Sequence, residues 1–238
     1  MQVVIFGATG MVGKGVLLEC LDDARVERVL LVSRHPVDVS HPKILDIVHH
    51  DFFDFASIQP QLADIDACFF CLGVTSIGLS ESEYHRLTYD LTLAAATALA
   101  SVTARRSTFC YVSGEGTDST ERGRTAWART KGKTENALLR LPFKAAFMFR
   151  PVYIQPLKGI RSKTRWYQAI YDVMGPFYPV LRRLLPRYVT TTVSIGRAMI
   201  QVAAAGYSKQ ILFSADINQL SASAGGTSRK PRVTRDRN

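Results

Sequence analysis

Short apolar runs alternate with longer amphipathic stretches along most of this chain. The short runs predict β-strands at Val3–Phe6, Arg28–Ser33, Ile44–Val48, Ala67–Cys71, Thr108–Ser113 and Ala145–Arg150. The longer stretches predict helices at Met11–Leu21, Phe55–Leu62, Ser80–Ala100, Ala126–Leu141 and Ser194–Ala205. Strands that alternate with helices pair in parallel through right-handed crossovers. The pattern therefore predicts an α/β fold with a Rossmann-type, doubly wound parallel sheet.

Glycines spaced three residues apart follow the first predicted strand. Gly7 permits a tight turn, Gly10 lets a pyrophosphate approach the backbone, and Gly13 lets the next helix pack closely on the sheet. The N-terminus of that helix offers N–H groups and a positive dipole end to phosphates. Because the strand–turn–helix context is present, we predict a dinucleotide site at Gly7, Thr9, Gly10, Met11, Val12 and Gly13.

The end of the second predicted strand carries Ser33 and Arg34, where an NAD site usually has an acidic residue. A guanidinium suits a 2′-phosphate, so this position predicts NADP(H) in preference to NAD(H). Asp51 and Phe52 follow the third predicted strand. They are predicted to flank the adenine, although Asp51 suits an N-terminal helix cap equally well.

Polar and small residues also follow the later predicted strands, at the edge where parallel sheets bind ligands. The predicted cofactor contacts there are Cys71, Leu72, Gly73, Arg150 and Pro151. The hydroxyl of Ser113 is expected to reach the same crevice from the fifth strand.

These positions together resemble the short-chain dehydrogenase/reductase superfamily. The resemblance is to its extended or atypical branch, among epimerase/dehydratase-like proteins and relatives of the Tat-interacting-protein group, and it covers about residues 1 to 215. In that family a Ser, a Tyr and a Lys carry catalysis, with the Tyr four residues before the Lys. The resemblance gives Ser113 the Ser role and Lys131 the Lys role, which includes a contact with the ribose of the cofactor. Trp127 stands at the Tyr position.

The missing tyrosine leaves the activity open, because an indole N–H donates a hydrogen bond but does not exchange a proton near neutral pH. One interpretation is a carbonyl reductase or epimerase-like oxidoreductase with a substitute acid/base, and this is the one we favour from sequence. The substitutes considered are Tyr111, Tyr153, Glu115 and Asp118. A second is a non-catalytic NADP(H) sensor acting on a protein partner, like the NmrA-like regulators of the superfamily. In a third, Lys131 itself takes part in proton transfer.

The formal net charge of +10 is partly concentrated at the C-terminus. Residues 221–238 predict a flexible basic tail that follows a single NAD(P)-binding domain over residues 1–220. No nucleic-acid recognition motif accompanies the charge. A basic rim would instead attract an anionic cofactor.

The stretch from about residue 155 to 190 is rich in aromatic residues, arginine and proline. It predicts a small C-terminal helical lid over a small-molecule carbonyl substrate. The alternative is a surface that meets a membrane or a protein partner through Phe177, Tyr178, Leu181 and Leu185. A homodimer is also open.

Metal binding is not expected. Cys68 and Cys71 have C-x-x-C spacing, but a strand would direct them to opposite faces, and no second Cys pair or His cluster completes a zinc site. The N-terminus enters a strand at once, without a charged region followed by an apolar one. The sequence therefore predicts a cytoplasmic protein.

Overall fold

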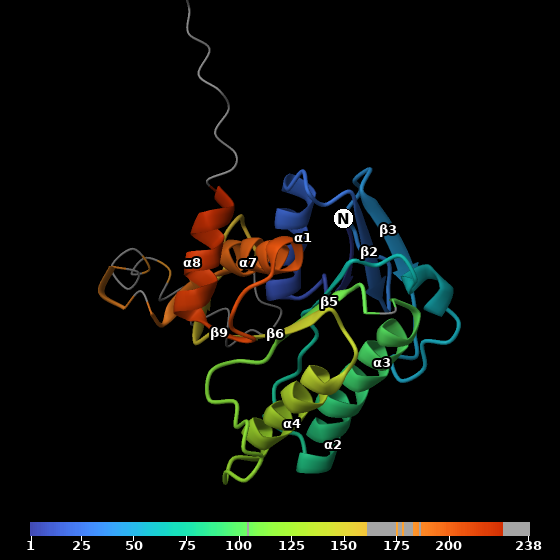
Figure 1. Ribbon diagram of the computed structural model, residues 1–238. Coiled ribbons are helices and arrows are strands. Elements are labelled where there is room, and N and C mark those ends of the chain that lie inside the picture. Colours follow the sequence, from blue (N-terminus) through green and yellow to red (C-terminus); the bar gives the residue numbers. More distant parts are fainter. Residues whose placement is uncertain (104, 161–174, 176–177, 179–182, 186, 226–238) are drawn as a thin grey trace, which may run out of the picture.

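A parallel sheet forms the centre of the molecule (Figure 1). The structure is a computed structural model that describes residues 1–103, 105–160, 175, 178, 183–185 and 187–225. Within these residues the main sheet has seven strands in the order β3-β2-β1-β4-β5-β6-β9, all parallel to their neighbours. The strands are β1 (Gln2–Phe6), β2 (Arg28–Ser33), β3 (Ile44–Val48), β4 (Ala67–Phe70), β5 (Thr108–Val112), β6 (Ala145–Arg150) and β9 (Ile211–Phe213).

Helices cover both faces of this sheet. One face carries α1 (Met11–Asp22), α7 (Thr192–Ala205) and α8 (Ser214–Gly225). The other carries α3 (Leu91–Thr103) and α4 (Ala126–Arg140), and Figure 1 shows the two groups on opposite sides. A short helix α2 (Glu81–His85) and a π-helical turn η2 (Arg86–Asp90) lead into α3. This is the doubly wound α/β architecture predicted from the sequence.

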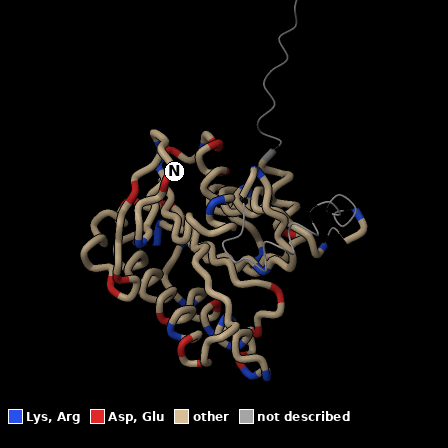
Figure 2. The backbone as a smooth tube through the Cα atoms, turned by 180° about the vertical axis from the view of Figure 1, so that it is seen from behind, with Lys and Arg blue, Asp and Glu red and all other residues tan. Residues whose placement is uncertain are grey.

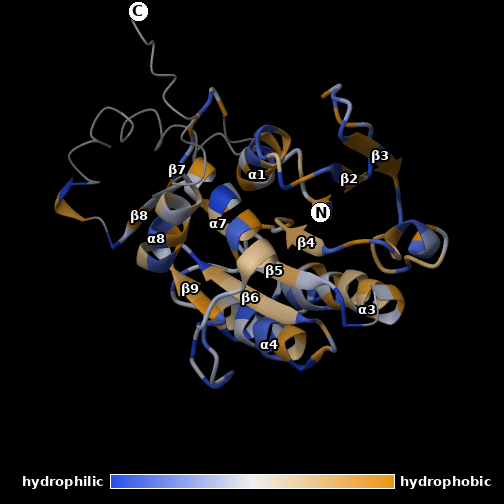
Figure 3. Ribbon diagram, turned by 45° about the horizontal axis from the view of Figure 1, so that its top comes forward, coloured by the Kyte–Doolittle hydropathy of each residue, from blue (hydrophilic) through white to orange (hydrophobic). Residues whose placement is uncertain are grey.

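The core consists of two apolar layers, one on each face. Along β1, Val3 and Ile5 enter the layer beneath α1 and α7, while Val4 and Phe6 enter the layer beneath α3. The central strands are therefore largely apolar, and Figure 3 shows β4 and β6 in the colours of hydrophobic residues. Cys68 and Cys71 also pack on opposite layers, as predicted.

The six predicted strands are confirmed to within one residue, but the predicted helix at Phe55–Leu62 is wrong. Only a 3-10 turn, η1 (Gln59–Leu62), forms there, with Pro60 in its first turn. Phe55, Ile58 and Leu62 are all buried under the sheet. Asp54 caps the preceding turn, where its Oδ1 accepts from Ala56 N at 2.9 Å. Apolar spacing here reflects a loop wrapped onto the core.

Several elements were not expected from the sequence. β7 (Tyr153–Gln155) and β8 (Val189–Thr191) form a separate parallel pair, and β9 lies at the edge of the main sheet. α8 continues to Gly225, past the predicted start of the tail at residue 221, and Ser221 is buried. Most of the predicted lid, with Phe177 and Leu181, and residues 226–238 of the tail lie outside the described residues.

Charged positions of both signs are spread along the described chain (Figure 2). Among the described helices, none is long and apolar enough to cross a membrane.

Candidate functional site

The predicted dinucleotide turn lies where the strand order reverses. β1 pairs with β2 on one side and β4 on the other, and the crevice beyond the carboxyl ends of such strands is where open α/β sheets bind ligands. Gly7 follows β1 with φ +83°, a conformation that favours glycine. A Cβ on Gly7 would lie 2.9 Å from the Cys71 carbonyl carbon. The turn is thus pressed against the end of β4.

The start of α1 is equally close to this turn. A Cβ on Gly13 would lie 2.1 Å from the Gly7 carbonyl oxygen, so only glycine fits there. Gly10 is the N-cap residue, with no side-chain cap, and the first turn of α1 contains no acidic residue. Thr9 is exposed, and Met11 and Val12 are half-buried beside it. The Gly10 N–H donates to the Gly7 carbonyl oxygen at 3.0 Å, whereas the first backbone N–H groups of α1 itself have no preceding turn to donate to and suit an external acceptor.

Ser33 and Arg34 stand at the carboxyl end of β2, next to this turn in the sheet order. The Ser33 hydroxyl donates to the His35 carbonyl oxygen at 2.6 Å, which fixes the start of the loop. Arg34 is exposed. The geometry leaves its guanidinium free to meet an anionic group from solvent.

Asp51 and Phe52 serve local structure. Asp51 Oδ1 accepts from Phe53 N at 2.9 Å, which is a turn cap rather than a helix cap. Phe52 is 7% exposed and packs edge-on against Phe6 and Phe55. Its ring is a core contact, with little surface left for an adenine.

The segment Cys71–Gly73 continues from β4 into the crevice. Cys71 N donates to the Phe6 carbonyl oxygen at 2.9 Å, and burial raises the pKa of the Cys71 thiol to about 12. Leu72 is half-buried and Gly73 is exposed. A Cβ on Gly73 would meet no atom of the described chain within 4 Å. Packing of the described chain therefore gives no reason for a glycine there.

Ser113 is placed differently from the expectation. Its hydroxyl donates to Glu135 Oε1 at 2.5 Å and lies 3.2 Å from the Phe149 carbonyl oxygen. Ser113 is 7% exposed and Glu135 is 1% exposed. The hydroxyl is thus directed into α4 and held there, with little access to a ligand in the crevice.

Arg150 completes this buried cluster. Its Nε donates to Glu135 Oε1 at 3.0 Å, its Nη2 also reaches the same carboxylate, and Nη2 donates to Ser119 Oγ at 2.5 Å. Arg150 was predicted as a cofactor contact, but its side chain is committed to Glu135. Pro151, the next residue, accepts from Glu115 N through its carbonyl oxygen at 3.0 Å.

Glu135 is the site residue that the sequence analysis missed. It lies four residues after Lys131 and eight after Trp127, so all three share one side of α4. The i, i+4 spacing from Lys131 was the available signal. A glutamate in a polar, amphipathic helix is normally solvent-exposed, which is why the pattern did not single it out.

Lys131 lies at the carboxyl end of β5. Its Nζ donates to the Ser113 carbonyl oxygen. Burial lowers the pKa of Lys131 to about 8, and the negative charge of Glu135 opposes this shift. The ammonium is therefore held at the crevice edge with a carbonyl, rather than a carboxylate, as its direct partner.

Trp127, one helical turn before Lys131, is half-buried. A Cβ on Gly116 would lie 3.1 Å from Trp127 Cη2, so the indole covers the loop that follows β5. This placement makes Trp127 a packing contact of the loop.

The alternative proton donors are poorly placed. Tyr111 is 2% exposed in the core, and burial raises the pKa of its phenol above the usual range. Hydrogen bonds from the Thr120 hydroxyl and Gly123 N–H lower the pKa of Asp118. The Tyr153 hydroxyl donates to Gln155 Oε1 at 2.8 Å within the separate sheet, and Glu115 is exposed.

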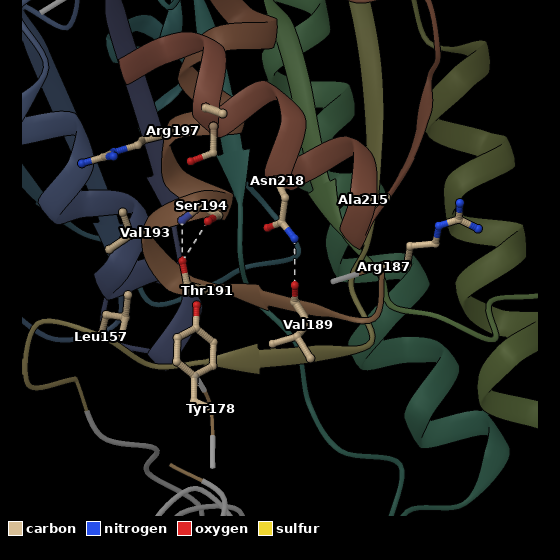
Figure 4. A pocket seen from close by; sticks show the side chains of 12 residues that line it. Leu157, Tyr178, Arg187, Val189, Thr191, Val193, Ser194, Arg197, Ala215 and Asn218 are labelled. Atoms are coloured by element: carbon tan, nitrogen blue, oxygen red, sulfur yellow. Dashed lines mark hydrogen bonds between the residues drawn. The ribbon is translucent and has the colours of Figure 1, made fainter. Parts of the chain in front are cut away.

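A hollow of about 640 Å³ lies elsewhere, between β8, α7 and α8 (Figure 4). Arg187 and Arg197 point away from each other at its two sides. Arg197 Nε donates to Glu19 Oε2 at 2.8 Å. Neither the glycine turn nor Ser113 or Lys131 lines this hollow. We therefore do not assign it to the dinucleotide.

The fold is similar to that of solved enzymes of the short-chain dehydrogenase/reductase and epimerase/dehydratase types. DesIV, a dTDP-glucose 4,6-dehydratase from Streptomyces venezuelae with NAD and DAU bound, matches with a TM-score of 0.65 over 95% of this chain and 81% of its own, at 15% identity. MoeE5 in complex with UDP-glucose and NAD gives 0.61 over 95% and 82%, also at 15% identity. A short-chain dehydrogenase/reductase family oxidoreductase from Burkholderia thailandensis gives 0.61 over 89% of each chain, at 14% identity.

Two curated fungal proteins are similar in sequence. Protein fmp52, mitochondrial, of Emericella nidulans is 29% identical over 176 residues, 71% of this chain and 72% of its own. Protein FMP52, mitochondrial, of Debaryomyces hansenii is 28% identical over 167 residues, 69% and 70% respectively. No protein-family model matches the chain. The mitochondrial names contradict the cytoplasmic prediction, which relied on the character of the first residues and is wrong.

Proposed function

We propose that the crevice at the carboxyl ends of β1 and β4 binds a nicotinamide dinucleotide. The observation that carries this proposal is the glycine turn, where Gly13 packs so closely on Gly7 that the uncapped start of α1 faces the crevice. The exposed Gly73, for which packing gives no reason, follows the end of β4, the strand next to β1. Structural neighbours with this fold hold NAD, as their names state. The residues present therefore suit the diphosphate of such a cofactor.

We further propose that NADP(H) is preferred. Arg34 is exposed at the end of β2, where an NAD site would place a carboxylate on the ribose hydroxyls. A guanidinium attracts the 2′-phosphate of NADP(H) by charge and by paired N–H donors. Thr9, Met11 and Val12 would line the phosphate side.

For the activity, the geometry favours cofactor binding coupled to a protein partner over the usual carbonyl reduction. The Ser113 hydroxyl, which would position a substrate oxygen in the family, donates to Glu135 instead. Trp127 cannot supply the proton that the family tyrosine supplies. A nicotinamide cofactor, when bound, supplies hydride transfer, but this chain's described residues offer little side-chain help with the accompanying proton. We therefore propose an NADP(H) sensor.

A second candidate is a slow reductase or epimerase-like oxidoreductase acting on a small carbonyl compound. It is favoured by Lys131, because an ammonium whose pKa is about 8 exchanges its proton more readily near neutral pH than an ordinary lysine. In this case Lys131 would donate a proton to the substrate oxygen.

Gly73→Ala tests the binding site. Because the added methyl group meets no atom of the described chain within 4 Å, the variant should unfold at the same denaturant concentration as the parent. It should bind NADPH about tenfold more weakly or worse, because the added methyl group would occupy space that the bound ligand needs next to the backbone. NADPH fluorescence titration measures the affinity. Unchanged affinity would remove Gly73 from the site, and a parent that binds no dinucleotide would refute the proposed function.

Turnover separates the two candidates. NADPH oxidation is followed with a panel of aldehydes and ketones, and NAD(P)+ reduction with UDP-glucose. A sensor should bind NADPH and turn over none of these compounds. Steady turnover that is lost in Lys131→Met would support the oxidoreductase.

A further inference from the structure

The buried cluster at the carboxyl ends of β5 and β6 has an unequal charge balance. Glu135 supplies one carboxylate, and two cations, Arg150 and Lys131, lie next to it. Arg150 takes that carboxylate through its Nε and Nη2 atoms, and the Ser113 hydroxyl donates to it as well. Lys131 donates to the Ser113 carbonyl oxygen instead. The cluster thus carries a net positive charge, and the uncompensated part of it is the Lys131 ammonium.

The position of this ammonium is fixed by the residues that it contacts. Ser113 follows β5 directly, and its N–H donates to the Phe149 carbonyl oxygen of β6 at 2.9 Å. The carbonyl that holds Lys131 is therefore fixed at the end of the sheet, and the Glu135 carboxylate of α4 accepts from the hydroxyl of the same Ser113. Lys131 is half-buried, so its charge is only partly screened by water and acts on whatever occupies the crevice.

We propose that Lys131 makes the cofactor site select the reduced dinucleotide over the oxidised one. The inference rests on the proposed function, which places a nicotinamide dinucleotide in this crevice. The two redox forms have the same phosphates, riboses and adenine, but the oxidised nicotinamide ring is a cation and the reduced ring is neutral. A fixed positive charge at the crevice edge repels only the oxidised ring. Lys131 is thus a specificity-determining residue for redox state.

A site without the family tyrosine can still act as a sensor, because sensing requires selective binding and no proton transfer. A sensor must distinguish NADPH from NADP+, and that distinction requires a differential interaction with the two forms. Hydrogen bonds from the glycine turn to phosphates stabilise both forms equally, so they supply affinity without selectivity. The Lys131 charge supplies the difference.

The experiment measures dissociation constants for NADPH and NADP+ by titration calorimetry, and takes their ratio. The ratio cancels contacts that both forms share, including any contact of Lys131 with a ribose. The parent should bind NADPH about tenfold more tightly, which corresponds to about 1.4 kcal/mol. Lys131→Met should bring the ratio close to one, whereas Lys131→Arg, which keeps the charge, should retain most of it.

Lys133→Met is the matched control. It removes the same charge from the same helix, but Lys133 is exposed and its Nζ lies over the Tyr89 ring on the outer surface. Its ratio should equal that of the parent. A parent ratio near one, or a ratio that survives in Lys131→Met, overturns the inference while leaving dinucleotide binding intact. Failure of the parent to bind either form overturns the proposed function and this inference together. If Lys131→Met does not fold, the parent ratio and Lys131→Arg still decide.

Discussion

Arg150→Met is expected to destabilise the protein strongly, because it leaves the Glu135 carboxylate buried without its main counter-ion. Glu135 is 1% exposed and Arg150 is 8% exposed. Arg150 Nε lies 3.0 Å and 3.2 Å from the two carboxylate oxygens. Removing one partner of such a buried pair costs about 3–5 kcal/mol. For a domain of this size that loss lowers the melting temperature by about 6 to 20 °C.

The pair should also behave as one unit. In Glu135→Leu the guanidinium is left uncompensated, and a similar loss is expected. When both changes are combined, neither charge remains unpaired, so the double variant Arg150→Met/Glu135→Leu should lose far less than the sum of the two single variants. The free energy of unfolding is measured for the four proteins by urea denaturation.

An arginine whose ion-pair partner is exposed provides the control. Arg129 forms an ion pair with Glu81 at 2.6 Å, in which Glu81 is largely exposed. Arg129→Met should therefore cost about 1 kcal/mol or less. Equal losses for Arg150→Met and Arg129→Met, or strict additivity in the double variant, would refute the buried coupling of Glu135 and Arg150.

Two further predictions concern the cofactor and the chemistry. Arg34→Ala should weaken NADPH binding by roughly tenfold to 150-fold, the value of a charged hydrogen bond, and leave NADH binding nearly unchanged; equal affinity of the parent for NADPH and NADH would contradict the role of Arg34. Trp127→Tyr places a phenol four residues before Lys131, but NADPH oxidation with aldehydes and ketones should rise less than tenfold, because the Ser113 hydroxyl stays on Glu135. A larger gain would show that the site is a reductase that lacks only its tyrosine.

The sheet could be predicted closely because its central strands are buried on both faces. β1, β2 and β4 to β6 have continuous apolar sequences flanked by turn residues, and such runs have few other interpretations in an α/β chain. The glycine turn could be predicted for a similar reason. The positive φ of Gly7 and the contact of Gly13 with the Gly7 carbonyl both arise within one short segment, so the local sequence is enough to indicate the turn.

Other elements could not be predicted because their constraints come from distant residues. β7 and β8 have three residues each and pair across more than thirty positions, so neither shows a local period. α8 ends in Ser-Ala-Ser-Ala-Gly, and this composition predicts a flexible tail from residue 221. It is stabilised by packing of Ile217 and Leu220 into the core beneath α7. Only the tertiary contact distinguishes this helix from a flexible segment.

The site shows the same limit at the level of single side chains. The order of Ser113, Lys131 and Arg150 along the chain predicts that they meet at one edge of the sheet, and their contacts with Glu135 and with each other agree with this. Order does not specify what each side chain bonds to there. Glu135 accepts hydrogen bonds from both the Ser113 hydroxyl and the Arg150 guanidinium, which directs these groups away from the crevice. The Lys131 ammonium, held by the Ser113 carbonyl, is then the charge that faces the crevice. The choice between the proposed sensor and a reductase therefore depends on a buried glutamate that the sequence motif does not include.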